Sequence, residues 1–82
     1  MSSIKTSQSD IFLLMNTAKL IGNNIKEARR AKGLTQKEVA SVMLMTQQQY
    51  SRFENGVFEL NYDQILKLCK ILDTTPNEIF SI

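Results

Sequence analysis

Short motifs that start α-helices recur along this chain, and they constrain its fold more than any other feature. Residues 35–38 read T-x-x-E and residues 46–49 read T-x-x-Q, a pattern in which the Thr hydroxyl caps a backbone amide and the Glu or Gln side chain reaches back. Residues 61–64 form a weaker version that begins with Asn. Residues 75–78 add Pro76 at the first helical position, where its missing N–H costs nothing. Four helix starts at such short intervals predict a succession of short helices.

Helix-stop signals lie between these starts. Gly33 follows a basic run, where a left-handed glycine suits a helix C-terminus. The Asn-Gly pair at 55–56 would suit a hairpin turn, but no alternating strands flank it, so a helix C-cap fits better. The pair Asp73-Thr74 separates the last two helices. One face of the helix predicted over residues 61–72 carries apolar residues at helical spacing, namely Ile65, Leu68, Cys69 and Leu72. The sequence therefore predicts an all-α fold of about five helices.

The N-terminal part allows two interpretations. Residues 1–8 are polar and predict a disordered segment, which leaves residues 9–82 as one small domain with Ser9 as an N-cap. An apolar stripe at helical spacing then runs through Ile11, Leu14, Ala18, Ile21, Ile25 and Ala28. One long helix would carry the whole stripe, whereas Gly22-Asn23-Asn24 favours a break and an extra N-terminal helix. The sequence leaves both interpretations open.

Composition excludes several function classes. The 82 residues include no His and one Cys, so the chain can build neither a Ser-His-Asp nor a Cys-His centre, nor a Cys-rich zinc site. We therefore expect no enzyme activity, no metal and no cofactor. The longest apolar run, residues 11–15, is far below the roughly 20 residues that span a bilayer. The first ten residues also lack the pattern of a secretory signal. These features predict a reduced, soluble, cytoplasmic domain without a membrane partner.

Charge is distributed unevenly along the chain. Residues 1–40 hold seven Lys and Arg against three Asp and Glu, whereas residues 41–82 hold three against five. Six of the basic residues lie between Lys19 and Lys37, with Glu27 alone opposing them. Such a run fits a solvated helix face, and it also fits an electrostatic footprint for a nucleic acid. Charge alone does not decide between the two.

Residues 35–54 form the segment with the most specific functional pattern. Two short helices joined by a tight turn, the second opening with uncharged polar side chains, are what reading of the DNA major groove requires. A helix over residues 47–54 would be about 12 Å long, enough to present two turns to base edges. The carboxamides of Gln47 and Gln48 match adenine N6 and N7, and Arg52, one turn on, can pair with guanine or with a phosphate.

The same residues resemble the Cro/repressor-type (XRE-like) helix-turn-helix family of phage repressors, restriction-modification controllers and antitoxins. The resemblance covers about 60 residues, from Ile21 to Phe80, and is carried by Ile21-Gly22, Ile25-Lys26, Arg29, Gly33-Leu34-Thr35-Gln36, Val39-Ala40, Arg52-Phe53-Glu54-Asn55-Gly56 and Leu72-Asp73-Thr74-Thr75-Pro76-Asn77-Glu78-Ile79-Phe80. It implies a five-helix domain like that of lambda repressor, with an extended or extra N-terminal helix, that binds double-stranded DNA.

Roles for single residues follow from this resemblance. It implies that the base readers are Gln47, Gln48 and Arg52, with Gln49 and Ser51 as further contributors. It implies phosphate contacts at Gln36, Lys37, Thr46, Asn55 and Gly56, the last two through backbone amides of the loop that they begin. In the family, Gln36 is often bonded to the first residue of the recognition helix. Arg29 and Glu54 match a structural ion pair that ties the first helix to the recognition helix.

Position 44 is where the chain departs from the family pattern, because Leu44 replaces the turn glycine. A left-handed conformation there would cost roughly 1–2 kcal/mol, and an altered turn would tilt the recognition helix. Ala40 matches the small residue between the two motif helices. Tyr50 replaces a β-branched core residue, so its hydroxyl needs a hydrogen-bond partner or an outlet to water.

One short recognition helix reads too few base pairs for a specific site, which predicts a homodimer on a palindromic operator. We expect the dimer interface in the uncharged C-terminal ending, at Ile79, Phe80 and Ile82, while residues 11–15 form either a second surface or part of an enlarged core. The leading hypothesis is a sequence-specific DNA-binding transcriptional regulator, most often a repressor. The alternative is an antitoxin or another interaction module that neutralises a partner protein.

Overall fold

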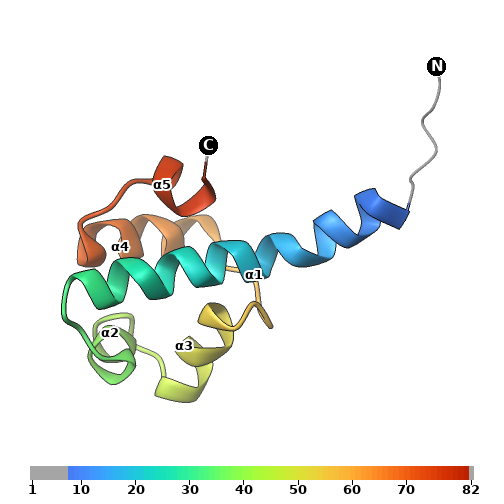
Figure 1. Ribbon diagram of the computed structural model, residues 1–82. Helices are drawn as coiled ribbons and strands as arrows, with labels where there is room; N and C mark the ends of the chain where they lie inside the picture. The colour runs from blue at the N-terminus through green and yellow to red at the C-terminus, as the bar shows by residue number, and fades with distance from the viewer. Residues whose placement is uncertain (1–7, 82) are drawn as a thin grey trace.

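The computed structural model describes the backbone of residues 8–81 and the side chains of residues 17–81. These residues form helices and connecting turns without any strand, which confirms the predicted all-α fold of five helices. The short helices lie around the C-terminal half of the first, with α2 and α3 on one side and α4 and α5 on the other (Figure 1). Their bounds are α1 (Gln8–Ala31), α2 (Gln36–Val42), α3 (Gln47–Glu54), α4 (Tyr62–Leu72) and α5 (Pro76–Phe80).

The first helix is continuous, so the structure supports one long helix and not an extra N-terminal one. It runs for 24 residues without interruption at 22–24. The N-terminal part of α1 projects beyond the other four helices (Figure 1). Most of the segment expected to be disordered, residues 1–8, lies outside the described residues, and Gln8 begins α1.

Local side-chain chemistry starts the short helices where the sequence predicts. Thr35, Thr46 and Asn61 each accept from the third backbone amide of the helix that follows, and the side chain at that third position accepts from the backbone N–H of the cap. In α5, Thr75 caps the amide of Glu78 and Pro76 occupies the first helical position. These reciprocal bonds satisfy amides that a helix cannot pair internally, which fixes the entry point of each short helix.

The core lies between α1 and the four short helices. Its fully buried members include Ile25 of α1, Tyr50 of α3 and Ile79 of α5. Ile79 is therefore a core residue of its own chain and not the dimer contact that we expected, while Phe80 beside it is only half-buried. Ile82 lies outside the described residues. Cys69 is buried on α4, where desolvation raises the pKa of its thiol and keeps it unreactive.

The C-terminal end of the described chain is fastened to the middle of α1. The Asn24 side-chain amide donates to the carbonyl oxygen of Ile79 and to the hydroxyl of Ser81, both at 2.8 Å. This clamp explains why Asn24 does not break α1, because its side chain is engaged with α5 and does not compete with the helical backbone. None of the helices between residues 8 and 81 has the length and apolar character needed to cross a bilayer.

Candidate nucleic-acid interface

The two faces of α3 are in opposite environments. Tyr50 is fully buried and Glu54 is only 3% exposed, so this side of the helix is fixed in the core. Gln48 and Arg52, four residues apart, are exposed on the outer side, and Gln47 is exposed in the first turn of the helix. A helix anchored along one face and polar along the other can enter a groove without giving up its own packing. The three side chains that the resemblance implies as base readers are thus all exposed.

The turn between α2 and α3 keeps the left-handed residue despite the missing glycine. Leu44 has φ +60°, and its side chain is 89% exposed. The amide of Leu44 donates to the carbonyl of Ser41, and the amide of Met45 donates to that of Ala40. Ala40 is buried where α2 packs on α3, which is the close approach that its small side chain allows. The turn therefore keeps its left-handed conformation, and the backbone of Leu44 is strained.

A buried ion pair joins α1 to α3. Arg29 Nε lies 2.6 Å from Glu54 Oε2 and Nη2 lies 3.1 Å from Oε1, while Nη1 donates to the carbonyl of Leu34 at 2.8 Å. Burial alone would raise the pKa of Glu54, but the hydrogen bonds from Arg29 and Gln36 outweigh it, so the carboxyl pKa is lowered from its ordinary value. The bidentate bond to Glu54 raises the pKa of Arg29. Both groups are therefore charged, and the pair fixes the tilt of α3 against α1.

Gln36 belongs to this network. Its Nε2 donates to Glu54 Oε1 at 3.0 Å, and the side chain is half-buried. The resemblance implied a bond to the first residue of the recognition helix, Gln47, but the described structure has the bond to Glu54 at the other end of α3 instead. The reason is geometric, because Gln36 opens α2 at the level where α3 ends. Gln36 thus links α2 to the same carboxylate that holds α1.

The Tyr50 hydroxyl is the buried polar atom without a partner in this region. It lies beside the Arg29–Glu54 pair and interacts with both side chains electrostatically, but no described group is placed with the distance and angle of a hydrogen bond to it. Burial raises the pKa of the phenol well above its ordinary value, so it remains neutral. The hydroxyl therefore has neither the partner nor the outlet to water that we expected it to need, and it does not reach the surface where a phosphate would bind.

Thr46 and Gln49, which were also predicted to contact DNA, form the cap of α3. The Gln49 Oε1 accepts from the backbone amide of Thr46 at 2.9 Å, and the Thr46 hydroxyl accepts from the amide of Gln49 at 3.1 Å. Gln49 therefore lacks the free carboxamide that bidentate base reading needs. The Thr46 hydroxyl hydrogen is still available to a phosphate, because the hydroxyl acts only as an acceptor in the cap.

The loop after α3 differs from the expectation drawn from the resemblance. The amide of Asn55 donates to the carbonyl of Ser51, and the amide of Gly56 donates to that of Phe53. Both backbone amides are thus satisfied within the helix cap and are not free for phosphate, which corrects the predicted role. The Asn55 side-chain amide, which donates to the Ser51 hydroxyl at 3.3 Å, is the exposed donor that remains at this site.

Two glycines bring α1 and the end of α3 into close contact. A β-carbon on Gly22 would lie 2.4 Å from the carbonyl oxygen of Phe53, and one on Gly56 would lie 2.6 Å from Cγ of Lys19. Gly56 also has φ +73°, which glycine adopts without strain. Backbone meets backbone here, so neither position has room for a side chain. The approach places the α3 terminus against the helix that carries the basic residues.

Phe58, which lies near the exposed side of α3, was not predicted from the sequence. The Arg52 guanidinium carbon lies 5.5 Å from the centre of the Phe58 ring, and Phe58 is half-exposed in the segment between α3 and α4. This cation–π contact holds the flexible Arg52 side chain close to its place without using its hydrogen-bond donors. A six-residue separation between Arg and Phe gives no motif, so only the path of the loop reveals the contact.

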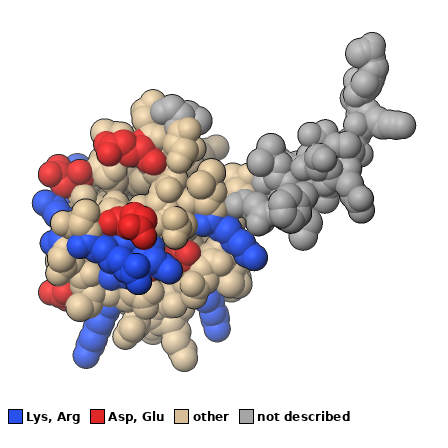
Figure 2. All heavy atoms as spheres, in the orientation of Figure 1, with Lys and Arg blue, Asp and Glu red and all other residues tan. Residues whose placement is uncertain are grey.

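Basic side chains surround this end of the molecule. Figure 2 shows Lys and Arg gathered over α1 and projecting from the end formed by α2 and α3. Lys37 on α2 is exposed and forms no salt bridge with any residue in the described part of the chain. Among the described side chains, those of residues 17–81, no cluster of Cys, Asp and Glu is arranged to hold a metal ion. The surface around α3 is therefore suited to a polyanion.

Five helices that present an exposed, polar and firmly anchored α3 define a DNA-binding helix-turn-helix domain. The family model for this helix-turn-helix matches residues 25–79, so the chain belongs to the HTH_3 family of Cro/C1 type. A search of curated proteins gives no significant match. The fold is similar to the crystal structure of the restriction-modification controller protein C.AhdI from Aeromonas hydrophila, with a TM-score of 0.73 and 30% identity over 80% of this chain and 96% of that chain. The chain is accordingly a DNA-binding regulator of transcription.

Proposed function

We propose that this protein represses transcription by binding a palindromic DNA operator as a homodimer. The observation that carries the proposal is the exposure of Gln48 and Arg52 on one face of α3, and of Gln47 at its N-terminal end, while Tyr50 and Glu54 fix the helix in the core. Side chains held in this way keep a constant geometry toward base edges, which sequence reading demands.

Gln47 and Gln48 are the principal base readers in this proposal. Each carboxamide offers a donor and an acceptor that fit the N6 and N7 positions of adenine. Arg52 lies one turn further along α3, and the contact with Phe58 leaves its guanidinium donors free for guanine O6 and N7. Ser51 is half-buried and contributes at most from the edge. We therefore expect an A/T-containing half-site with one G near the reach of Arg52.

Phosphate contacts come from side chains around α2 and α3. Lys37 supplies a free positive charge, the Thr46 hydroxyl has a hydrogen to donate, and the Asn55 side-chain amide lies at the far end of α3. Gln36 keeps a second amide hydrogen for a phosphate while the first holds Glu54. Such contacts set affinity and register, whereas the outer face of α3 supplies specificity.

Dimerisation follows from how little sequence one such helix reads. Two copies related by a two-fold axis would read half-sites about 34 Å apart, one turn of the duplex. The similar structure is that of a controller protein of a restriction-modification system. We propose the corresponding role here, in which occupation of promoter DNA controls a gene.

Selection from a randomised duplex pool at about 150 mM salt tests the proposal, because nonspecific phosphate binding is weak at that ionic strength. The expected result is a palindrome with half-sites about one helical turn apart. A reporter gene with the selected site in its promoter should then be expressed less when the protein is present. Recovery of no preferred sequence by a folded protein would overturn the proposal and point to a protein partner, as for an antitoxin.

A further inference from the structure

The exposed side chain of Arg52 lies over the ring of Phe58. Its guanidinium carbon is 5.5 Å from the ring centre, a distance at which the negative face of an aromatic ring attracts a cation. Arg52 forms no salt bridge with any residue in the described part of the chain, so no carboxylate competes with the ring for it. The contact with Phe58 therefore restricts a side chain that would otherwise move freely in water.

The backbone position of Phe58 is fixed at both ends of the segment between α3 and α4. At the first end, the amide of Val57 donates to the carbonyl oxygen of Arg52 at 2.8 Å. At the second end, Leu60 is half-buried and packs against the core. The segment thus returns onto the last turns of α3 before it enters α4, and this path brings Phe58 beside Arg52.

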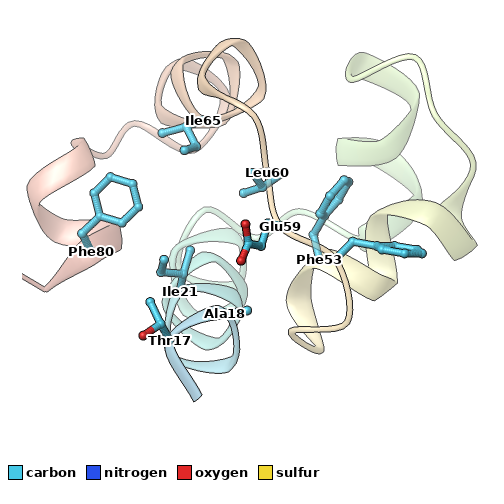
Figure 3. A pocket seen from close by; sticks show the side chains of 9 residues that line it. Thr17, Ala18, Ile21, Phe53, Glu59, Leu60, Ile65 and Phe80 are labelled. Atoms are coloured by element: carbon cyan, nitrogen blue, oxygen red, sulfur yellow. The ribbon is translucent and has the colours of Figure 1, made fainter. Parts of the chain in front are cut away.

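The side chain of Phe58 also has an apolar environment. It lines a pocket of about 260 Å³ between α1, α4 and the segment that precedes α4. Figure 3 shows Phe53 of α3, Leu60 of the segment and Ile65 of α4 around this pocket. Half of the Phe58 surface is buried, and burial of apolar surface is favourable, so the ring is kept on this side of α3. A side chain fixed in this way is a firm support for its neighbour.

We propose that Phe58 is a positioning residue for base reading, because its ring holds the Arg52 guanidinium where it meets guanine in the operator. A cation–π contact uses the charge of the guanidinium and none of its N–H donors, so the bidentate bond to guanine O6 and N7 stays possible. Without the ring, the same side chain is free to pair with a phosphate, which carries no sequence information. The inference rests on the proposed function and names a residue on which its specificity depends.

The substitution Phe58→Leu tests this role, because it keeps an apolar side chain and removes the aromatic face. The measured quantity is the ratio of affinities for the selected operator and for one whose guanine pair is replaced in one half-site. This ratio should fall roughly two- to fivefold, which corresponds to the strength of an exposed cation–π contact. Phe58→Tyr keeps the aromatic face and should retain the wild-type ratio. Val57→Ala, at the exposed neighbouring position, is the control and should retain it too.

A double-mutant cycle shows whether Phe58 acts through Arg52. In an Arg52→Ala background, Phe58→Leu should cause no further loss of guanine preference. Preference at the bases assigned to Gln47 and Gln48 should be unchanged by Phe58→Leu, whereas a loosened α3 would lower it at every position. Site-specific incorporation of 3,4,5-trifluorophenylalanine at position 58 nearly keeps the shape of the ring and weakens its negative face. This variant should lose guanine preference even if Phe58→Leu fails to fold.

The outcomes separate this inference from the proposed function. Wild-type guanine preference in the fluorinated variant overturns positioning by Phe58, and a protein that still selects a palindrome leaves the proposed function in place. A loss that persists in the Arg52→Ala background overturns it as well, because Phe58 then acts by another route. If Arg52→Ala weakens binding to all duplexes equally, Arg52 contacts a phosphate and the inference fails. A folded protein that selects no sequence overturns both.

Discussion

Gly22 of α1 lies directly against the last peptide group of the recognition helix, so that a β-carbon on Gly22 would be only 2.5 Å from the carbonyl oxygen of Glu54. The same Glu54 is bound through its side chain by Arg29, two turns further along α1. Backbone contact and ion pair thus fix the end of α3 at two points on one helix. The orientation of α3 is set by α1 as much as by the turn that precedes it.

Gly22→Ala should destabilise the protein, although alanine is the better helix former. The helix preference favours Ala by about 1 kcal/mol, but overpacking against rigid carbonyl oxygens typically costs about 1–3 kcal/mol. We expect a lower melting temperature, measured by circular dichroism. Asn23→Ala, at the exposed neighbouring position, is the control and should not lower it. A Gly22→Ala variant as stable as wild type would show that α1 and α3 can separate without loss.

Glu54→Gln should cost about 3 kcal/mol at pH 7, because it leaves the Arg29 charge buried without its partner. Since the pKa of Glu54 is lowered by folding, its contribution to stability is complete above the unfolded value near 4.3 and is lost as pH falls through the folded value. The stability difference between wild type and variant should therefore shrink in acid. Urea titrations at pH 7 and below pH 4 measure it, with exposed Glu59→Gln as the control. A difference independent of pH would contradict the assignment.

Leu44→Gly should raise the melting temperature. Leucine at φ +60° bears roughly 1–2 kcal/mol of strain, which exceeds the backbone entropy that glycine adds to the unfolded chain. Leu44→Ala keeps the strain and removes the same exposed side chain, so it should not produce this gain. Calorimetry of the three proteins distinguishes the two effects. Equal melting temperatures for the Gly and Ala variants would show that the exposed leucine side chain, and not its backbone, governs stability here.

Gln47→Ala should relax base preference at one position of each half-site by about 1–3 kcal/mol while leaving the fold unchanged, because the side chain is exposed. Competition binding with duplexes changed one base at a time measures the effect. Asn77→Ala removes an exposed carboxamide on α5, on the other side of α1 from α3, and should leave preference at every base unchanged. If the Gln47 variant retains the wild-type preference at all positions, Gln47 is not a base reader.

The helix starts could be predicted from sequence because their chemistry is local. Thr35, Thr46 and Asn61 act on residues three positions away, and the bounds of α2, α3 and α4 follow from them. The continuity of α1 could not be predicted, since it depends on Gly22 meeting α3 and Asn24 meeting α5, both distant in sequence.

In the candidate site, too, some contacts could be predicted from the sequence and others could not. The ion pair between Arg29 and Glu54 was expected from the resemblance and is present. The partner of Gln36 and the use of the Gly56 amide were not foreseen, because each depends on where α3 ends relative to its neighbours. Ile79 was misplaced for a related reason: an apolar C-terminal ending suits a core as well as an interface, and only the packing of α5 on α1 distinguishes them.

The division of α3 into an anchored face and an open face has a consequence for how such a regulator changes over time. Gln47 and Gln48 are exposed, so substitutions there change stability little and new operator preferences can arise by single mutations. Gly22 and Glu54 have no such freedom. Gene duplicates of this protein could therefore diverge to separate targets while the scaffold that aims α3 stays the same.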